Sequence, residues 1–163
     1  MYILLIIMKS KNEKFNMKKA GESSNCACFN LRKITRVVTQ VFEDVFRHEG
    51  IDLKGTQYSL LVNVFAYGPI PITRLSEILV MDRTSLARNL KPLINKGYLK
   101  INNGADKRIK MVELTPAGKQ ILSNAYPHWK SAQKSVVKEI GEKNWKLMFD
   151  SINSFVPKFE SIM

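Results

Sequence analysis

The sequence predicts a mainly α-helical fold with one small β-hairpin, and three observations support this. Apolar residues recur at helical spacing through most of the chain from residue 28 onward. One stretch, residues 98–114, instead alternates apolar and polar side chains around a cluster of Asn, Gly and Asp. The composition, 45% hydrophobic and 25% charged in 163 residues, is ordinary for one globular domain with a core.

The N-terminal half contains three predicted helices. The first covers 28–48 and has an apolar stripe wider than one neighbouring helix requires, which indicates an interface with a second copy of the chain. The second covers 56–67 and is stopped by Gly68 and Pro69. A short third helix covers 71–79, and only Val80 and Met81 separate it from the next.

The next helix begins at Asp82, whose carboxylate is a good N-cap, and ends at Gly97, which supplies a left-handed residue. Pro92 inside it removes one hydrogen bond, so we expect a kink there. One face is apolar, with Leu86, Leu90, Leu93 and Ile94. The opposite face contains hydroxyls, amides and cations but no carboxylate, through Thr84, Ser85, Arg88, Lys91 and Asn95. Such a face suits phosphates and base edges.

A basic hairpin follows this helix. We expect strands over 98–101 and 109–114, joined by a turn at 102–106. Between Asp82 and Lys110 there are eight Lys or Arg and two Asp, a net +6 of the chain's +12. With a pI near 9.8, this concentration of charge predicts a polyanionic partner, and nucleic acid is the obvious one.

The C-terminal part contains two predicted helices. Thr115 is an N-cap followed by Pro116 at the first helical position, and this helix continues past a kink at Pro127 to Gly141. The last helix covers 142–162 and has a stripe of large apolar side chains: Trp145, Met148, Phe149, Ile152, Phe155 and Phe159.

Helix, tight turn, helix and basic hairpin together make the plan of a winged helix-turn-helix. In that plan the second helix enters the major groove of double-stranded DNA and the hairpin reaches the adjacent minor groove. A basic amphipathic helix alone is explained equally well by a solvated surface, but the hairpin beside it favours the DNA-binding interpretation.

Two motifs in this region resemble the MarR family of bacterial transcriptional regulators. They are Asp82-Arg83-Thr84-Ser85-Leu86 with Arg88-Asn89-Leu90, and Asp106-Lys107-Arg108 followed by Val112-x-Leu114-Thr115-Pro116-x-Gly118. The resemblance covers most of residues 26–163. It implies that Arg108 enters the minor groove and that Asp106 steadies it. The chain departs from the family pattern at three positions: Ala105, Val80 and Pro71 stand where many relatives have arginine, glycine and Ser or Thr.

The predicted mechanism is that of a repressor binding a palindromic operator as a homodimer and released by a small-molecule or oxidative signal. The resemblance implies that the first helix and the last two interlock with a second copy, so that two recognition helices meet major-groove faces about 34 Å apart. The predicted DNA-binding residues are Arg83, Thr84, Ser85, Arg88, Asn89, Lys91, Asp106, Lys107 and Arg108.

The predicted organisation is one MarR-like domain over 26–163 after a disordered basic arm at 1–25. Within the domain, 56–114 form the winged helix-turn-helix, and 28–48 and 115–162 form the dimerisation helices. The apolar start, residues 1–8, is too short to span a bilayer and lacks the features of a signal peptide. We therefore expect a cytoplasmic protein without a membrane partner.

The two cysteines, Cys26 and Cys28, are too few for a closed zinc site, and neither His48 nor His128 lies at metal-ligand spacing from them. We expect no metal and no cofactor. One interpretation is a helix entrance with small, partly buried thiols. The other comes from resemblance, because Cys28-Phe29 with Leu31 and Arg36 is similar to the start of OhrR-type peroxide sensors.

In those sensors the oxidised cysteine releases DNA, which would make Cys28 the reactive thiol and Cys26 a resolving partner. Their thiolate is held by tyrosine hydroxyls, and approximate matching puts Phe42 and Gly55 in those places.

Three further hypotheses concern ligands and function class. His128 and Trp129 lie where MarR relatives often bind aromatic or phenolic effectors, although a packing role explains them as well. An enzyme is not expected, because the sequence has no nucleophile elbow, glycine-rich phosphate loop or clustered carboxylates. A non-specific chromosome-coating protein would explain the charge but not the wing.

Overall fold

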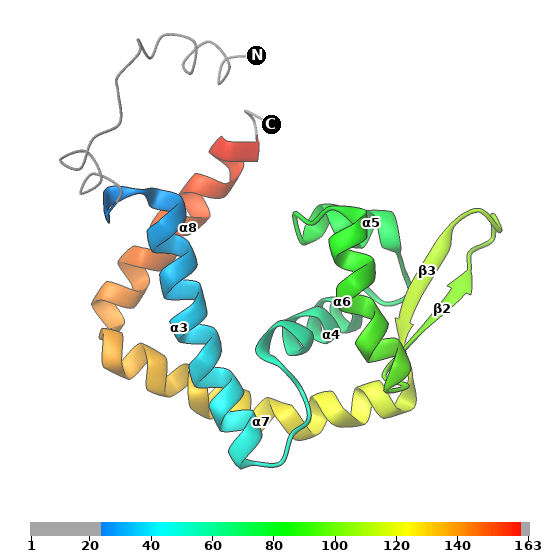
Figure 1. The fold of residues 1–163 in the computed structure, drawn as a ribbon, viewed down its shortest axis with the longest axis horizontal. Coiled ribbons are helices and arrows are strands. Elements are labelled where there is room, and N and C mark those ends of the chain that lie inside the picture. The colour runs from blue at the N-terminus through cyan, green and yellow to red at the C-terminus, as the bar shows by residue number, and fades with distance from the viewer. Residues whose placement is uncertain (1–23, 161–163) are drawn as a thin grey trace, which may run out of the picture. The chain divides into compact units, whose positions relative to one another are not determined.

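The structure, a computed structural model, describes residues 24–160 (Figure 1). The expectations for the apolar start at 1–8 and for nearly all of the arm at 1–25 therefore lie outside the described residues. In chain order the elements are α3 (Ala27–His48), α4 (Gly55–Tyr67), β1 (Ile70–Pro71), α5 (Ile72–Ile78), α6 (Arg83–Asn95), β2 (Leu99–Asn103), β3 (Lys110–Leu114), α7 (Pro116–Ile140) and α8 (Glu142–Glu160). The predicted fold class, mostly helical with a small β wing, is confirmed.

The chain divides into two compact units. One comprises Val38–Gln133 and holds α4, α5, α6, the three strands and parts of α3 and α7. The other comprises Met1–Val37 and Lys134–Met163, and its described part contains the start of α3, the end of α7 and α8.

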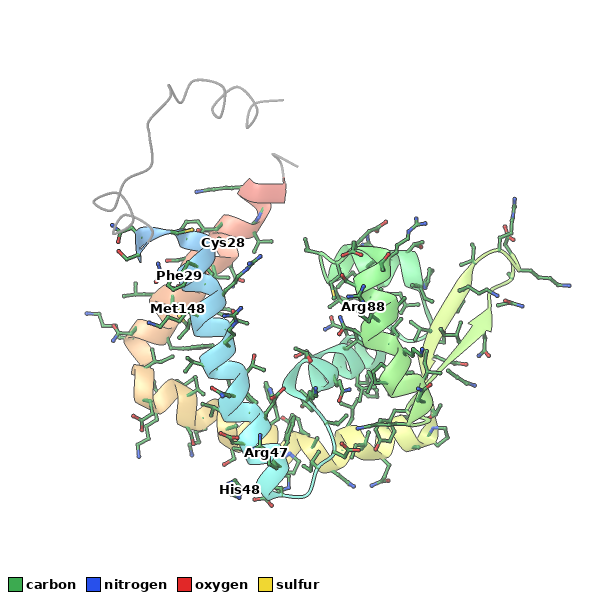
Figure 2. The ribbon with its side chains drawn as sticks, viewed as in Figure 1. Cys28, Phe29, Arg47, His48, Arg88 and Met148 are labelled. Atoms are coloured by element: carbon green, nitrogen blue, oxygen red, sulfur yellow. The ribbon has the colours of Figure 1, made fainter. Side chains whose placement is uncertain are left out.

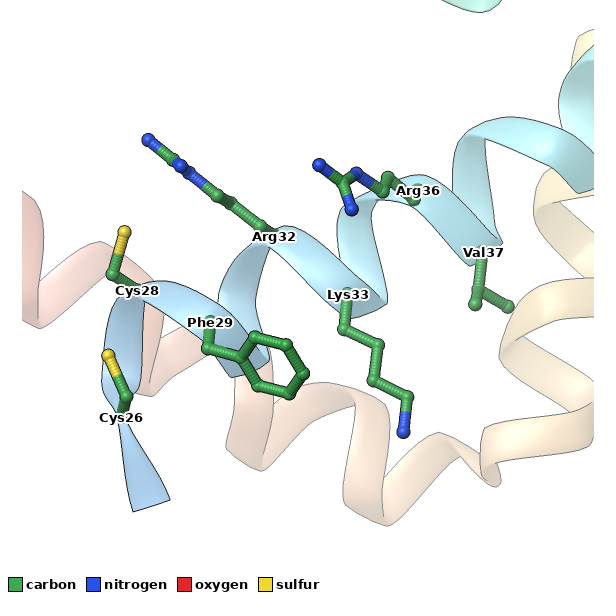
Figure 3. Close-up of a pocket in the computed structure, with 7 residues that line it drawn as sticks. All are labelled: Cys26, Cys28, Phe29, Arg32, Lys33, Arg36 and Val37. Atoms are coloured by element: carbon green, nitrogen blue, oxygen red, sulfur yellow. The ribbon is translucent and has the colours of Figure 1, made fainter. Parts of the chain in front are cut away.

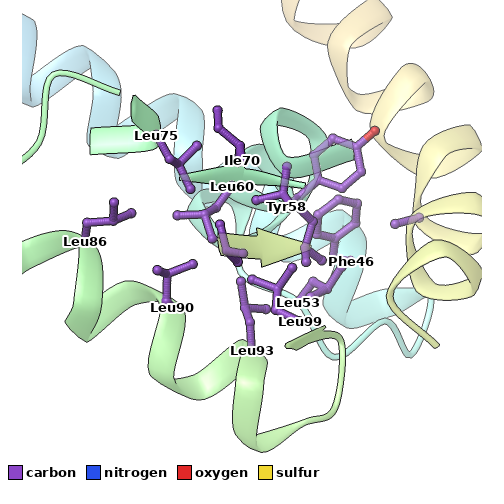
Figure 4. Close-up of a cluster of buried hydrophobic side chains, with 14 residues drawn as sticks. Phe46, Leu53, Tyr58, Leu60, Ile70, Leu75, Leu86, Leu90, Leu93 and Leu99 are labelled. Atoms are coloured by element: carbon purple, nitrogen blue, oxygen red, sulfur yellow. The ribbon is translucent and has the colours of Figure 1, made fainter. Parts of the chain in front are cut away.

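The core of the Val38–Gln133 unit is built around the apolar face of α6 (Figure 4). Leu86, Leu90 and Leu93 of α6 are at most 1% exposed, as the helical periodicity predicted. They belong to the same buried cluster as Leu75 of α5 and Val112 of β3. The burial of these side chains leaves the opposite, polar face of α6 to the solvent.

The three strands form one antiparallel sheet in the order β1-β3-β2. The predicted hairpin is confirmed, with Leu99 opposite Leu114 and Asn103 opposite Lys110. Two details were wrong. Residues 102 and 103 continue strand β2 instead of starting the turn, because their pairing with β3 outweighs the local turn preference of asparagine. The short strand β1 was missed, because two residues carry no periodic signal.

The boundaries of α6 and α7 meet at a hydrogen-bonded junction. Gly97 has a φ of 71° and ends α6, with its amide donating to the Ile94 carbonyl at 2.9 Å, as predicted. Thr115 caps α7 by accepting from the Gly118 amide at 3.0 Å, and its hydroxyl donates to the Gly97 carbonyl at 2.6 Å. The first turn of α7 is thus tied to the end of α6.

Helix α5 begins at Ile72, one residue later than the predicted helix start at Pro71. Pro71 belongs to β1, where it pairs with Met111 of β3. The α6 helix runs unbroken from Arg83 to Asn95 with Pro92 inside it, and α7 likewise continues through Pro127.

In the other unit, α8 exposes a stripe of large apolar side chains: Phe149, Ile152, Phe155 and Val156. Leu147 is also exposed, on another side of α8. The start of α3 exposes Phe29, Leu31, Ile34 and Val37. Trp145 and Phe149 stack within α8 with ring centroids 5.9 Å apart. No helix within residues 24–160 is both long enough and apolar enough to cross a bilayer.

Candidate nucleic-acid interface

The start of α6 is organised by Asp82. Its carboxylate accepts a hydrogen bond from the Ser85 amide at 2.9 Å, which satisfies one of the free donors of the first helical turn. Hydrogen bonds from the Ser85 side chain and backbone hold the pKa of Asp82 below its ordinary value. The predicted N-cap is confirmed. Because this carboxylate faces the helix end, it leaves the exposed side of α6 free of negative charge.

The exposed side of α6 contains most of the residues that the sequence predicted to contact DNA. They are Arg83, Thr84, Arg88, Asn89 and Lys91, all exposed on a helix whose other face is buried in the core. Arg88 stands near the middle of α6 (Figure 2). Ser85 differs, because it is half-buried and its hydroxyl takes part in capping with Asp82.

The turn between β2 and β3 is shaped by Asp106 and Arg108. The Asp106 carboxylate accepts from the Arg108 backbone amide at 2.9 Å and from its guanidinium Nε and Nη2 at 3.1 and 2.9 Å. These bonds lower the pKa of Asp106. The two-point contact fixes the direction of a guanidinium that is otherwise 90% exposed. Lys107 lies between them and is also exposed.

The strands of the wing carry two further cations that the sequence prediction counted as charge without assigning a role. Lys110 Nζ lies 2.7 Å from the Asn103 side-chain oxygen. Lys100 Nζ lies 2.8 Å from a carboxylate oxygen of Glu113 across the hairpin. These contacts pair residues on facing strands: Lys100 lies against a carboxylate, whereas Lys110 contacts a neutral amide.

One contact at the far end of the recognition helix had no signal in the sequence. Lys96 Nζ lies 2.7 Å from the Asp52 carboxylate and 2.9 Å from the Asp52 carbonyl oxygen, and the two residues are 44 positions apart. Lys96 was expected only to add to the basic charge. It instead ties the end of α6 to the loop between α3 and α4.

A cavity of about 870 Å³ lies between α4 and α7, inside the Val38–Gln133 unit. Its wall includes Tyr58, Tyr126 and Trp129, with Lys119 among the polar residues. Trp129 stacks on Tyr58 with ring centroids 5.8 Å apart and on Tyr126 at 6.1 Å. Burial raises the pKa of Tyr58, with a smaller contribution from Tyr126. The neighbouring His128 instead faces Glu49, with 3.4 Å between Nδ1 and the carboxylate.

Both cysteines are free and exposed at the start of α3. Figure 3 shows Cys28, Arg32 and Arg36 projecting to one side of this helix, and Phe29, Lys33 and Val37 to the other. These residues and Cys26 line a shallow hollow of about 510 Å³. The predicted partly buried thiols are therefore wrong in one respect: both thiols are open to reactants. Among the described residues, no three His, Cys, Asp or Glu side chains gather where they could hold a metal ion.

The geometry agrees with comparisons to known proteins. The family model of the winged helix DNA-binding domain matches residues 53–118, which include the helix-turn-helix and the wing. The uncharacterised HTH-type transcriptional regulator YdgG of Bacillus subtilis is 23% identical over 124 residues, covering 74% of this chain and 79% of that protein.

Two solved structures share the fold. The transcriptional regulator MosR of M. tuberculosis, in complex with DNA, is 29% identical with a TM-score of 0.74, and the match covers 84% of this chain and 98% of that chain. A mutant MarR from E. coli, complexed with operator DNA, has a TM-score of 0.73 at 17% identity, covering 83% of this chain and 97% of that chain. The second likeness concerns the fold alone.

Proposed function

We propose that the chain, which contains a winged helix DNA-binding domain and resembles MarR-like transcriptional regulators, is a repressor that binds a palindromic operator through α6 and the wing. The observation that carries this proposal is the exposed side of α6. It presents Arg88, Asn89 and Thr84 without a carboxylate, on a helix anchored from behind by three buried leucines. Arginine and asparagine are the side chains that read guanine and adenine edges in the major groove.

The wing supports the same proposal. The Asp106 carboxylate holds the Arg108 guanidinium in one direction and leaves it exposed, as a minor-groove probe requires. Lys107 and Lys91 are exposed beside these base-reading elements, and we assign them to phosphates. Arg83 at the first helical position has the same role or reaches a base, while Ser85 contributes through the capped geometry of the helix start.

The test is a selection of bound sequences from a random duplex pool at fixed salt, followed by affinities for the selected and a random duplex. A repressor binds its selected duplex about 4–10 kcal/mol more tightly than random DNA. A chromosome-coating protein binds both duplexes about equally, and its affinity falls steeply with salt. Arg88→Ala should weaken the selected duplex by about 1–3 kcal/mol and the random duplex far less. Equal losses of affinity for both duplexes would show that α6 does not read base edges.

We propose that the functional form is a homodimer. In the unit that contains α8, the start of α3 and the length of α8 each expose several large apolar side chains. Such grouped exposure differs from the single apolar residues scattered over an ordinary surface. A two-fold dimer through these helices would give two recognition helices for two half-sites, which is why the selected motif should be palindromic.

The cavity between α4 and α7 is the proposed effector site. Its stacked aromatic wall and Lys119 suit a small aromatic or phenolic acid, with the ring against Trp129 and the anion near the ammonium group. Such a ligand should release the operator duplex and raise Tm with the logarithm of its concentration once that concentration exceeds Kd. Tyr126→Ala should reduce both effects while leaving the operator affinity of the ligand-free protein unchanged.

Thiol-based redox sensing is the second candidate, and the exposure of Cys28 beside Arg32 favours it. The thiolate is the form of cysteine that attacks a hydroperoxide. The Cys28 thiolate attacks the terminal oxygen of the hydroperoxide. The O–O bond breaks as the S–O bond forms, and the alkoxide leaves and takes up a proton, which gives a sulfenic acid and an alcohol. The Cys26 thiol then attacks the sulfenic sulfur to form a disulfide, releasing water.

The selection distinguishes the two signals when it is repeated after mild organic hydroperoxide. Loss of the motif in the wild type and its survival in Cys28→Ser would establish the redox signal. Survival in both proteins would leave the aromatic effector as the signal.

A further inference from the structure

Val80 has an unusual backbone conformation at the turn between α5 and α6. Its φ of 49° makes it the only non-glycine residue with a positive φ in the described part of the chain. The Val80 amide donates to the Glu77 carbonyl at 3.1 Å and the Met81 amide to the Ser76 carbonyl at 2.9 Å. This is the left-handed helix ending in which glycine is the usual residue, because a β-branched side chain is strained there.

Contacts of the neighbouring residues hold this turn, and the side chain of Val80 itself adds nothing to the core. The Val80 side chain is 60% exposed and takes no part in the buried cluster, whereas the adjacent Met81 packs against that cluster and anchors the turn. A glycine would form the same hydrogen bonds without strain. Backbone strain of this kind gathers at functional sites, so the strained position of Val80 is a candidate for a contact outside the chain.

The position of Val80 indicates what that contact is. Val80 is two residues before Asp82, the N-cap of α6, and so lies at the end of the recognition helix that approaches the base edges. The apolar group on the major-groove edge of a base pair is the C5-methyl of thymine. We propose that the isopropyl group of Val80 packs against a thymine methyl in each half-site, which makes Val80 a specificity-determining residue. This inference rests on the proposed function.

The experiment uses the full chain and the duplex obtained by selection, with each thymine of a half-site replaced in turn by deoxyuridine, which lacks only the methyl group. The wild type should lose about fourfold in affinity at one position per half-site, the change expected for burial of one methyl group. Val80→Gly and Val80→Ala should both bind the thymine and deoxyuridine duplexes equally at that position.

Thermal unfolding of the same variants separates the side chain from the backbone. Val80→Gly should raise Tm by roughly 2–6 °C because it relieves the left-handed strain. Val80→Ala should not, since alanine is strained there too. If only Val80→Gly lost the response to deoxyuridine, backbone freedom and not the isopropyl group would be responsible, and the inference would be overturned.

Arg88→Ala in the same titrations separates this inference from the proposed function. If Arg88→Ala keeps the full preference for the selected duplex, base readout by α6 itself fails. If Arg88→Ala loses that preference while the Val80 variants respond to deoxyuridine as the wild type does, or if the wild type responds at no thymine, the Val80 inference alone is wrong.

Discussion

Asp82 and Asp106 are the two acidic residues of the basic segment 82–110, and both bind to the chain itself. Asp82 caps α6 through Ser85, and Asp106 binds the backbone and guanidinium of Arg108. Their carboxylates therefore shape the helix start and the wing turn. In the proposed interface, these two acidic residues orient their neighbours for a polyanionic partner.

The cap at Asp82 predicts a defined pH dependence. The folded protein lowers the pKa of Asp82, so its contribution to stability is fully present above the ordinary value of 3.8 and is lost as pH falls through the lowered value. Asp82→Ala should therefore lower Tm at pH 7, and the difference from the wild type should shrink below about pH 4. Circular dichroism melts between pH 2 and 7 measure this, and a constant difference across that range would contradict it.

Gly118 predicts a second residue-scale effect, at the junction between α6 and α7. A Cβ at this position would overlap the Tyr98 carbonyl oxygen, which accepts a hydrogen bond from the Thr115 amide at 3.0 Å, and the Leu114 side chain. Gly118→Ala should destabilise the fold by about 1–3 kcal/mol in urea unfolding. Gly104→Ala is the matched control, because its Cβ would meet only ordinary contacts, and equal effects would rule out the steric explanation.

The wing acts as an element because the cross-strand contacts support its tip. Pairing of β2 with β3 continues to Asn103 and Lys110, so only a short turn carries Asp106 and Arg108. The addition of β1 on the other side of β3 attaches the hairpin to the strand that precedes α5. The sheet thus connects the wing to the start of α5, the first helix of the helix-turn-helix.

This arrangement predicts different roles for the two neighbouring cations of the wing. Arg108→Ala should weaken binding by about 1–3 kcal/mol and remove any preference for A·T pairs beside the half-site, because only a narrow minor groove favours an inserted guanidinium. Lys107→Ala should weaken binding equally to duplexes with A·T flanks and with G·C flanks. It should also reduce the slope of log affinity against log salt concentration. Affinities for duplexes with exchanged flanks decide this, and an intact A·T preference in Arg108→Ala would remove Arg108 from the interface.

At the scale of the whole molecule, the proposed DNA contacts belong to one unit and most of the proposed dimer interface to the other. The recognition helix, the wing and the proposed effector cavity all belong to Val38–Gln133, while the apolar stripe of α8 belongs to the other unit. Two helices, α3 and α7, contribute to both units. A change confined to α8 should therefore alter oligomeric state without altering the interface for a single half-site.

Phe155 tests this separation, because it is 50% exposed on the apolar stripe of α8. Phe155→Asp should convert a dimer into a monomer in sedimentation experiments, since a buried carboxylate in an apolar interface is unfavourable. Affinity for the palindrome should fall more than tenfold, while affinity for a single half-site should stay the same. Ser154→Asp places the same group on an exposed residue outside the stripe and should leave both unchanged. A Phe155→Asp protein that remains dimeric would exclude α8 from the interface.

The sequence alone determined most of the fold and the polarity of the interface. Helical spacing placed Leu86, Leu90 and Leu93 in the core, Asp82, Gly97 and Thr115 marked helix ends, and the resemblance to MarR-family regulators was confirmed. These features are local, because the periodicity, capping and turn chemistry of a few adjacent residues encode them. The residues predicted to contact DNA remain a proposal. Three of them, Thr84, Arg88 and Lys91, lie exposed on the face of α6 that periodicity assigned.

The tertiary structure alone decided which distant residues meet. The pairing of Lys96 with Asp52, the strand β1 and the aromatic wall of Tyr58, Tyr126 and Trp129 each join segments far apart in the chain. The positive φ of Val80 is also a result of the tertiary structure. Packing around the turn imposes this conformation, whereas Val80 and its neighbours in an isolated peptide could adopt others. Contacts of this kind depend on the free energy of the whole fold, and no window of adjacent residues contains that information.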